Sequence, residues 1–178
     1  GVEEQSIGAQ MEAISWMTAA GFPPARAAFT GQNYGARQYN RIRKGYRLTL
    51  GSAGSIGLFA GILFFIFNRE IFSLFVNEGA TIQAGGNYLK ILALSQLFMV
   101  TESVTAGAFN GTGHTTPPAL TSIILTGARI PMAYLLTAIP ALGLTGIWWS
   151  ITISSIMKGS VLPLWFLHFQ RKLNYVQT

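Results

Sequence analysis

Cysteine and aspartate are both absent from the 178 residues, and charge of either sign is scarce. Without cysteine the chain forms no disulfide, thiol nucleophile or thiolate metal site, and without aspartate it lacks every motif that requires one. Only 10% of the residues are charged, whereas soluble domains carry about a quarter. Half of the residues are apolar and the mean hydropathy is positive. This composition indicates an integral membrane protein.

The first residues, GVEEQS, do not form a secretory signal, because no basic start precedes a short apolar core and a cleavage site. The sequence also begins without methionine. We therefore expect these residues to be part of a longer protein.

The segment from Gly31 to Arg47 concentrates positive charge. It holds five of the twelve basic residues and no acidic residue. Membrane-length apolar segments flank it, so the positive-inside rule predicts that it faces the cytoplasm. In a soluble protein this segment, in a chain of net charge +6, would suggest a nucleic-acid partner. The apolar flanks favour a basic loop at an anionic inner leaflet instead, with no nucleic acid.

A helix that crosses the hydrocarbon core needs about 20 mostly apolar residues. Segments of this kind predict an all-α, polytopic membrane helix bundle with about five transmembrane helices. The first is interrupted by GFPP, where proline predicts a kink or break. In the second, Gly51, Gly54, Gly57 and Gly61 predict a smooth face on which another helix packs. The five predicted spans are residues 6–30, 46–67, 88–110, 119–139 and 142–169.

Ionisable residues inside a span are functional candidates, because burying a charge there costs several kcal/mol. Glu102 lies roughly 12 Å from the inner end of the third span. A carboxyl group there can bind a proton reversibly, and a nearby cation competes with that proton, as an ion-coupled antiporter requires. The alternative is a structural Glu102 that pairs with Ser103, Gln96 or a basic group on another helix.

Other polar residues in the spans are secondary candidates. Glu12, in the first span beside Gln10 and Trp16, is either a second coupling acid facing a cavity or an interfacial glutamate. Arg129 and Lys158 are either counter-charges for Glu102 or a substrate, or structural pairs. We predict no metal site, since two histidines cannot hold zinc without further ligands. The candidate cavity-lining residues are Gln10, Trp16, Gln96, Met99 and Asn110.

Several stretches together resemble the multidrug and toxic compound extrusion (MATE) family. GQNYGARQYNRIRKGYR is similar to the loop between the second and third helices of each half, with Gly31, Gln32, Gly35 and Arg37 as its motif. GAFNGTGHTTPP resembles the turn after helix 10. ARIPMAYLL and GLTGIWWSITIS resemble helices 11 and 12. The ordered series extends from about Gln5 to Leu173.

The resemblance implies helices 8 to 12, the larger part of the C-terminal lobe of a twelve-helix fold whose N-terminal lobe is the missing partner. It implies a secondary-active antiporter in the cell membrane that exports drugs or cationic organic compounds in exchange for H⁺ or Na⁺, without another cofactor. The helix-10 acid of the NorM-type branch would align nearer Met99, about one turn from Glu102. A lipid-linked oligosaccharide flippase of the same superfamily is the alternative. A membrane-embedded enzyme is a weaker one, because Ser52 and Ser55 have no histidine predicted to face them.

Overall fold

The computed structural model describes residues 21–74, 79–140, 142–143 and 145–175, and all regular structure in them is helical. The predicted all-α helix bundle is confirmed for this part of the chain. The helices are α2 (Phe22–Gly35), α3 (Tyr39–Ile66), α4 (Asn68–Ser73), α5 (Gly79–Gly111), α6 (Thr116–Gly127), α7 (Arg129–Thr137) and α8 (Thr145–Tyr175).

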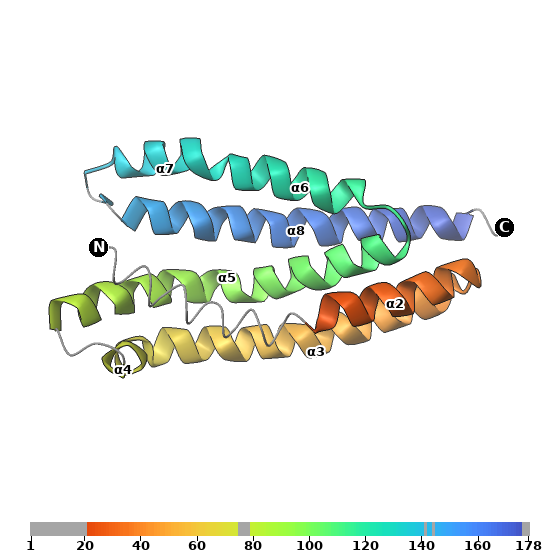
Figure 1. Cartoon of the computed structure of the whole chain (residues 1–178), viewed down its shortest axis with the longest axis horizontal. Helices are drawn as coiled ribbons and strands as arrows, with labels where there is room; N and C mark the ends of the chain where they lie inside the picture. Colours follow the sequence, from red (N-terminus) through yellow and green to blue (C-terminus); the bar gives the residue numbers. More distant parts are fainter. Residues whose placement is uncertain (1–20, 75–78, 141, 144, 176–178) are drawn as a thin grey trace.

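Helix α5 lies at the centre of the bundle (Figure 1). It packs against α3 and α2 on one side and against α8 on the other. Helices α6 and α7 run along the outer side of α8, and the short α4 packs against α5 near its start. Every long helix therefore touches α5 or lies one helix away from it.

Four helical segments among the described residues are long and apolar enough to cross a membrane, and they correspond to the second to fifth predicted spans. The helices extend past the predicted ends: α3 begins at Tyr39 rather than Tyr46, and α5 at Gly79 rather than Tyr88. The prediction counted only apolar residues, whereas Arg, Lys and Gln also favour helix and continue it beyond the hydrocarbon. The segments are Tyr39–Ile66, Gly79–Gly111, Thr116–Thr137 and Thr145–Leu173.

The first predicted span is described only from Gly21 onward, so Glu12, Gln10 and Trp16 lie outside the described residues. Helix α2 starts at Phe22, with Pro23 in its first turn. Proline is tolerated there because the first backbone N–H groups of a helix have no intrahelical partner. The GFPP sequence, where we predicted a kink or break, is thus the start of α2.

The predicted basic loop is mostly helical. Gly31, Gln32 and Gly35 belong to α2, and α3 begins at Tyr39, so only residues 36–38 connect the two helices. Arg37 adopts a left-handed conformation with φ 56°, which reverses the chain in this short turn. The basic segment therefore forms a tight helical hairpin that α3 continues, and the loop prediction is wrong for the three residues in α2.

The main hydrophobic core lies where α5 meets α3 and α8. Tyr46 of α3 and Phe109 of α5 both pack on Phe166 of α8, with ring centroids 4.7 Å and 4.9 Å apart. A second cluster of Phe72, Tyr88, Leu89 and Leu92 lies around the start of α5. Bulky side chains thus hold α5 to both neighbours. The main cluster comprises Ile42, Tyr46, Ala53, Val100, Val104, Ala108, Phe109, Leu162 and Phe166.

The predicted glycine face of α3 packs on α5 over only half of its length. A Cβ on Gly61 would lie 2.9 Å from a carbonyl oxygen of α5, and one on Gly57 would lie 3.0 Å from a valine methyl group. A Cβ on Gly54 would make only an ordinary contact, at 3.6 Å, and one on Gly51 would meet nothing within 4 Å. The packing prediction is therefore confirmed for Gly57 and Gly61 and wrong for Gly51, which lines a groove.

Candidate functional site: an ion pair inside the helix bundle

Two opposite charges meet in the interior of the bundle. Glu102 on α5 and Lys158 on α8 form an ion pair, with Lys158 Nζ 3.2 Å from Glu102 Oε1. The lysine side chain is 10% exposed and the glutamate side chain 21%. Glu102 lies nine residues before the end of α5 at Gly111, roughly 14 Å along the helix. Pairing offsets part of the cost of placing each charge at this depth.

A proline in α8 helps to position this pair. Pro163 has no N–H, so the carbonyl of Gly159, four residues earlier, loses its donor within α8. The Thr101 hydroxyl of α5 lies 3.1 Å from that carbonyl oxygen and also 2.9 Å from the Phe98 oxygen of its own helix. The hydroxyl shares its one proton between these two acceptors, so Thr101 replaces in part the donor that Pro163 removed.

The backbones of α5 and α8 approach closely at the same point. A Cβ on Gly159 would collide with the backbone of Phe98, so no larger residue fits without movement of a helix. Lys158 directly precedes Gly159, and Glu102 directly follows Thr101. The close crossing therefore brings the two charged side chains together as neighbours of the contact.

Arg129, the other predicted counter-charge, is bonded to α8 rather than to Glu102. Its Nε and Nη2 donate to the hydroxyls of Ser154 and Ser155 on α8, at 3.0 Å and 3.2 Å. The Ser154 hydroxyl in turn donates to the Leu125 carbonyl of α6 at 2.9 Å. Arg129 thus ties the α6–α7 segment to α8. Ser155 and Lys158 are three residues apart on α8, so both cations lie along one face of it.

The predicted cavity-lining residues have different environments. Gln96 is buried at 3% exposure, Met99 is half-buried and Asn110 is exposed near the end of α5. Ser95 and Met99 are in contact, with Oγ 3.7 Å from Sδ. Ser95, Met99 and Glu102 recur at helical spacing, so they share a face of α5. The structure therefore places Met99 beside Glu102 and Asn110 at a distance from it.

Sequence reasoning missed the residues that support the ion pair. Thr101, Gly159, Ser154 and Ser155 carry no charge, and Ser154 lies in GLTGIWWSITIS without being singled out there. One usable signal was present: Pro163 lies inside a span and has no N–H, so the carbonyl of the residue four positions earlier, Gly159, lacks its helical donor. No signal identified the two serines, because serine is common throughout the chain.

A second buried cation is Arg26 of α2, which we expected to extend to the inner membrane interface. It is 3% exposed, donates from Nη2 to the Ile42 carbonyl at 2.8 Å, and lies 5.7 Å from the centroid of the Tyr46 ring. The Tyr46 hydroxyl is 2.8 Å from the Thr105 hydroxyl, which donates to the Thr101 carbonyl. Arg26 therefore joins α2 to α3, and the polar contacts continue along α5 as far as the Thr101 contact.

These features define a polytopic helical membrane protein with a charged pair inside its bundle. The MatE family model matches residues 5–135. The chain therefore belongs to the MATE family, as the sequence motifs predicted, and to a family of transporters rather than of enzymes.

The curated relatives of this chain are longer proteins with names that refer to multidrug resistance. A probable multidrug resistance protein NorM of Thermotoga maritima is 30% identical over 166 residues, which are 90% of this chain and 35% of that protein. The probable multidrug resistance protein YoeA of Bacillus subtilis is 26% identical, over 78% of this chain and 30% of its own length. The chain thus spans about a third of the length of these relatives.

Two solved structures of multidrug resistance MATE family transporters share the fold. The inward-facing one has a TM-score of 0.86 and 19% identity, over 96% of this chain and 40% of that chain. The outward-facing one has a TM-score of 0.89 and 21% identity, over 98% of this chain and 40% of that chain. The arrangement of helices in this chain is therefore close to both conformations.

Proposed function

We propose that these residues form helices 8 to 12, the larger part of the C-terminal lobe, of a secondary-active exporter. The exporter would carry drugs or cationic organic compounds in exchange for H⁺ or Na⁺, with the N-terminal lobe of the same transporter as partner in the bilayer. The names of the relatives favour drug export over the flippase alternative. The observation that carries the coupling proposal is the ion pair between Glu102 and Lys158.

The chemistry of the pair supports cation exchange. Glu102 is the carboxylate that neutralises Lys158, and a proton, a sodium ion or a cationic substrate would compete with the lysine for the same oxygens. Binding of one cation to Glu102 releases Lys158 and changes the contact between α5 and α8. Because the competing cations share one carboxylate, binding of one weakens binding of the other, and this coupling is reciprocal.

The test is Glu102→Gln in the transporter at its native length. Glutamine keeps the size and much of the hydrogen bonding but cannot ionise, so ion-coupled export should be abolished while expression persists. Drug efflux from vesicles with an imposed ion gradient measures this. Glu70→Gln, an exposed carboxylate on α4, is the matched control and should leave efflux unchanged.

Folding and coupling effects can be separated with a second variant. The loss of Glu102 leaves Lys158 unpaired, which destabilises less than the ~3–5 kcal/mol of a fully buried pair because both side chains keep some exposure. Glu102→Gln combined with Lys158→Gln removes both charges and should recover the melting temperature but not the export. Normal efflux by the Glu102→Gln variant would show that the pair is structural and that coupling lies elsewhere.

The membrane orientation belongs to the same proposal. The basic hairpin between α2 and α3 would face the cytoplasm, and the start of α5 would face the outside. Gln38 lies in the hairpin turn and Ala80 at the start of α5, and both are exposed. Single cysteines at these positions should react with a membrane-impermeant maleimide from opposite sides, Ala80→Cys from outside. Labelling of both from the outside would contradict this topology.

A further inference from the structure

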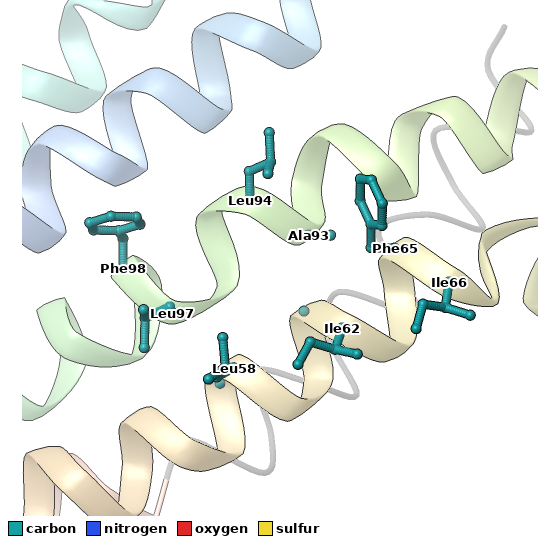
Figure 2. Close-up of a pocket in the computed structure, with 10 residues that line it drawn as sticks. Leu58, Ile62, Phe65, Ile66, Ala93, Leu94, Leu97 and Phe98 are labelled. Atoms are coloured by element: carbon teal, nitrogen blue, oxygen red, sulfur yellow. The ribbon is translucent and has the colours of Figure 1, made fainter.

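A groove in two adjacent parts runs along α3 and α5. One part has a volume of about 490 Å³ and lies between the apolar side chains of the two helices, such as Leu58 and Ile62 on α3 and Leu94 on α5 (Figure 2). A second part, of about 480 Å³, is lined by α3, α5 and α8. Both parts are lined by Leu97 and Phe98, so they are adjacent on the surface of α5. The second part is lined by Arg47, Leu50, Gly51, Gly54, Leu97, Phe98, Thr101, Gly159 and Pro163.

One cation lines this otherwise apolar groove. Arg47 is exposed, and Arg43 and Lys44 precede it by four and three residues, so the three share one side of α3. The carboxylates of the described residues do not neutralise it: Glu102 pairs with Lys158, and Glu70 lies in α4, beyond the other end of α3. Arg47 therefore presents an uncompensated positive charge where the groove begins.

The dimensions suit one acyl chain. On α3 the lining of the two parts extends from Arg47 to Ile66, nineteen residues or roughly 28 Å, and its portion from Arg47 to Leu58 is roughly 16 Å long. The hydrocarbon of one leaflet is about 15 Å thick. Side chains around the groove on α3 are strongly exposed, with Leu48 at 64% and Phe59 at 63%, as expected for a surface in contact with lipid.

We propose that this groove is a binding site for an anionic phospholipid of the leaflet on the side of the basic hairpin. The lipid phosphate would contact Arg47, with Lys44 and Arg43 adding to the positive field. One acyl chain would lie over Gly51 and Gly54, where the absence of side chains leaves room, and continue toward Leu58. The apolar groove holds the acyl chain, and the positive charge at the head-group depth selects an anionic lipid over a zwitterionic one.

The test measures lipid adducts on the purified, native-length protein by native mass spectrometry. Phosphatidylglycerol is compared with phosphatidylcholine of identical acyl chains, and the anionic lipid should bind more tightly. Arg47→Gln should weaken phosphatidylglycerol binding about fivefold, the effect of one basic residue near a lipid head group. Arg41→Gln is the charge-matched control, because Arg41 lies on the same helix, is bonded to Gln38 and does not line the groove. Arg41→Gln should weaken phosphatidylglycerol binding less than twofold.

A second variant tests the acyl-chain part. Gly51→Leu fills the groove without a clash, since a Cβ there meets nothing within 4 Å, and it should reduce adducts of both lipids. Gly127→Leu on α6, where a Cβ also meets nothing within 4 Å, should leave binding unchanged. Equal affinity for the two lipids, or equal losses with Arg47→Gln and Arg41→Gln, would overturn the proposal. So would unchanged phosphatidylglycerol binding in the Gly51→Leu variant. None of these outcomes bears on export through Glu102.

Discussion

Helix α5 and the α6–α7 segment are both long and apolar enough to cross a membrane, with nearly the same mean hydropathy. Their positions in the molecule are opposite. Half of the most apolar stretch of α5 is buried among other helices, whereas 6% of that of Thr116–Thr137 is buried. Hydropathy therefore identifies a membrane span, but it does not distinguish a central helix from a peripheral one.

Besides its bulky core side chains, α5 buries polar and small residues that the α6–α7 segment leaves exposed or lacks. Helix α5 buries Ser95, Gln96 and Thr105, and it presents Gly107 and Gly111 to the backbone of α2. The one residue buried in the α6–α7 segment is Thr121. In lipid, a central helix gains stability from close backbone contact and hydrogen bonds rather than from greater hydrophobicity, since lipid tails are as apolar as leucine. The exposed side of α6–α7 is left for lipid or for the other lobe of the proposed transporter.

The largest expected difference in stability between variants of the two regions comes from a glycine-to-alanine substitution in each. Gly159→Ala in α8 places a Cβ against the backbone of α5, and overpacking of this kind costs about 1–3 kcal/mol despite the better helix propensity of alanine. The variant should therefore melt at a lower temperature in detergent, as measured by loss of the monodisperse peak in size-exclusion chromatography after heating.

The control is the same substitution in the peripheral segment. Gly127 lies at the end of α6, and a Cβ there meets nothing within 4 Å. Gly127→Ala should leave stability unchanged or raise it by up to ~1 kcal/mol, the propensity difference between alanine and glycine. If both variants melted alike, the crossing of α5 and α8 would not be the tight contact that the structure shows.

Much of the fold followed from the sequence because the membrane imposes a length on each span. The second to fifth spans were predicted near their observed positions, and the glycine spacing in α3 correctly indicated contact at Gly57 and Gly61. The ends of the helices did not follow, because no hydrophobic signal marks where a helix stops in water. The loop motif at Gly31, Gln32 and Gly35 was misread as irregular for the same reason: a polar, basic segment can be helical.

The candidate site followed only in part. Charge inside a span pointed to Glu102, Lys158 and Arg129 individually, since each is costly there. Which cation pairs with Glu102 depends on how α8 is rotated against α5, and the sequence of either helix alone does not contain that rotation. The close contact at Gly159 restricts the rotation of α8 against α5. In the observed rotation Arg129 donates to Ser154 and Ser155.

Removal of the hydrogen bond that compensates for Pro163 should lower the stability by a smaller amount. Thr101→Val keeps the shape of the side chain but removes the hydroxyl that lies 3.1 Å from the Gly159 carbonyl. The carbonyl would then lack both its helical donor and the donor that replaces it. The free energy of unfolding should therefore fall by about 1–2 kcal/mol. Thr126→Val, at an exposed position on the peripheral α6, should change the melting temperature little, because no carbonyl that a proline deprives of its donor depends on the Thr126 hydroxyl.

Restoring the backbone donor provides the decisive arm of this experiment. Pro163→Ala supplies an N–H four residues after Gly159, so the carbonyl regains its intrahelical partner and no longer depends on Thr101. Thr101→Val should therefore cost clearly less in the Pro163→Ala background than alone, and the double-mutant cycle should show a coupling energy of about 1 kcal/mol. Additive effects would mean that Thr101 acts on something other than the carbonyl freed by the proline. Because Thr101 adjoins Glu102 and Gly159 adjoins Lys158, a coupling of this size would place a stabilising bond directly beside the ion pair.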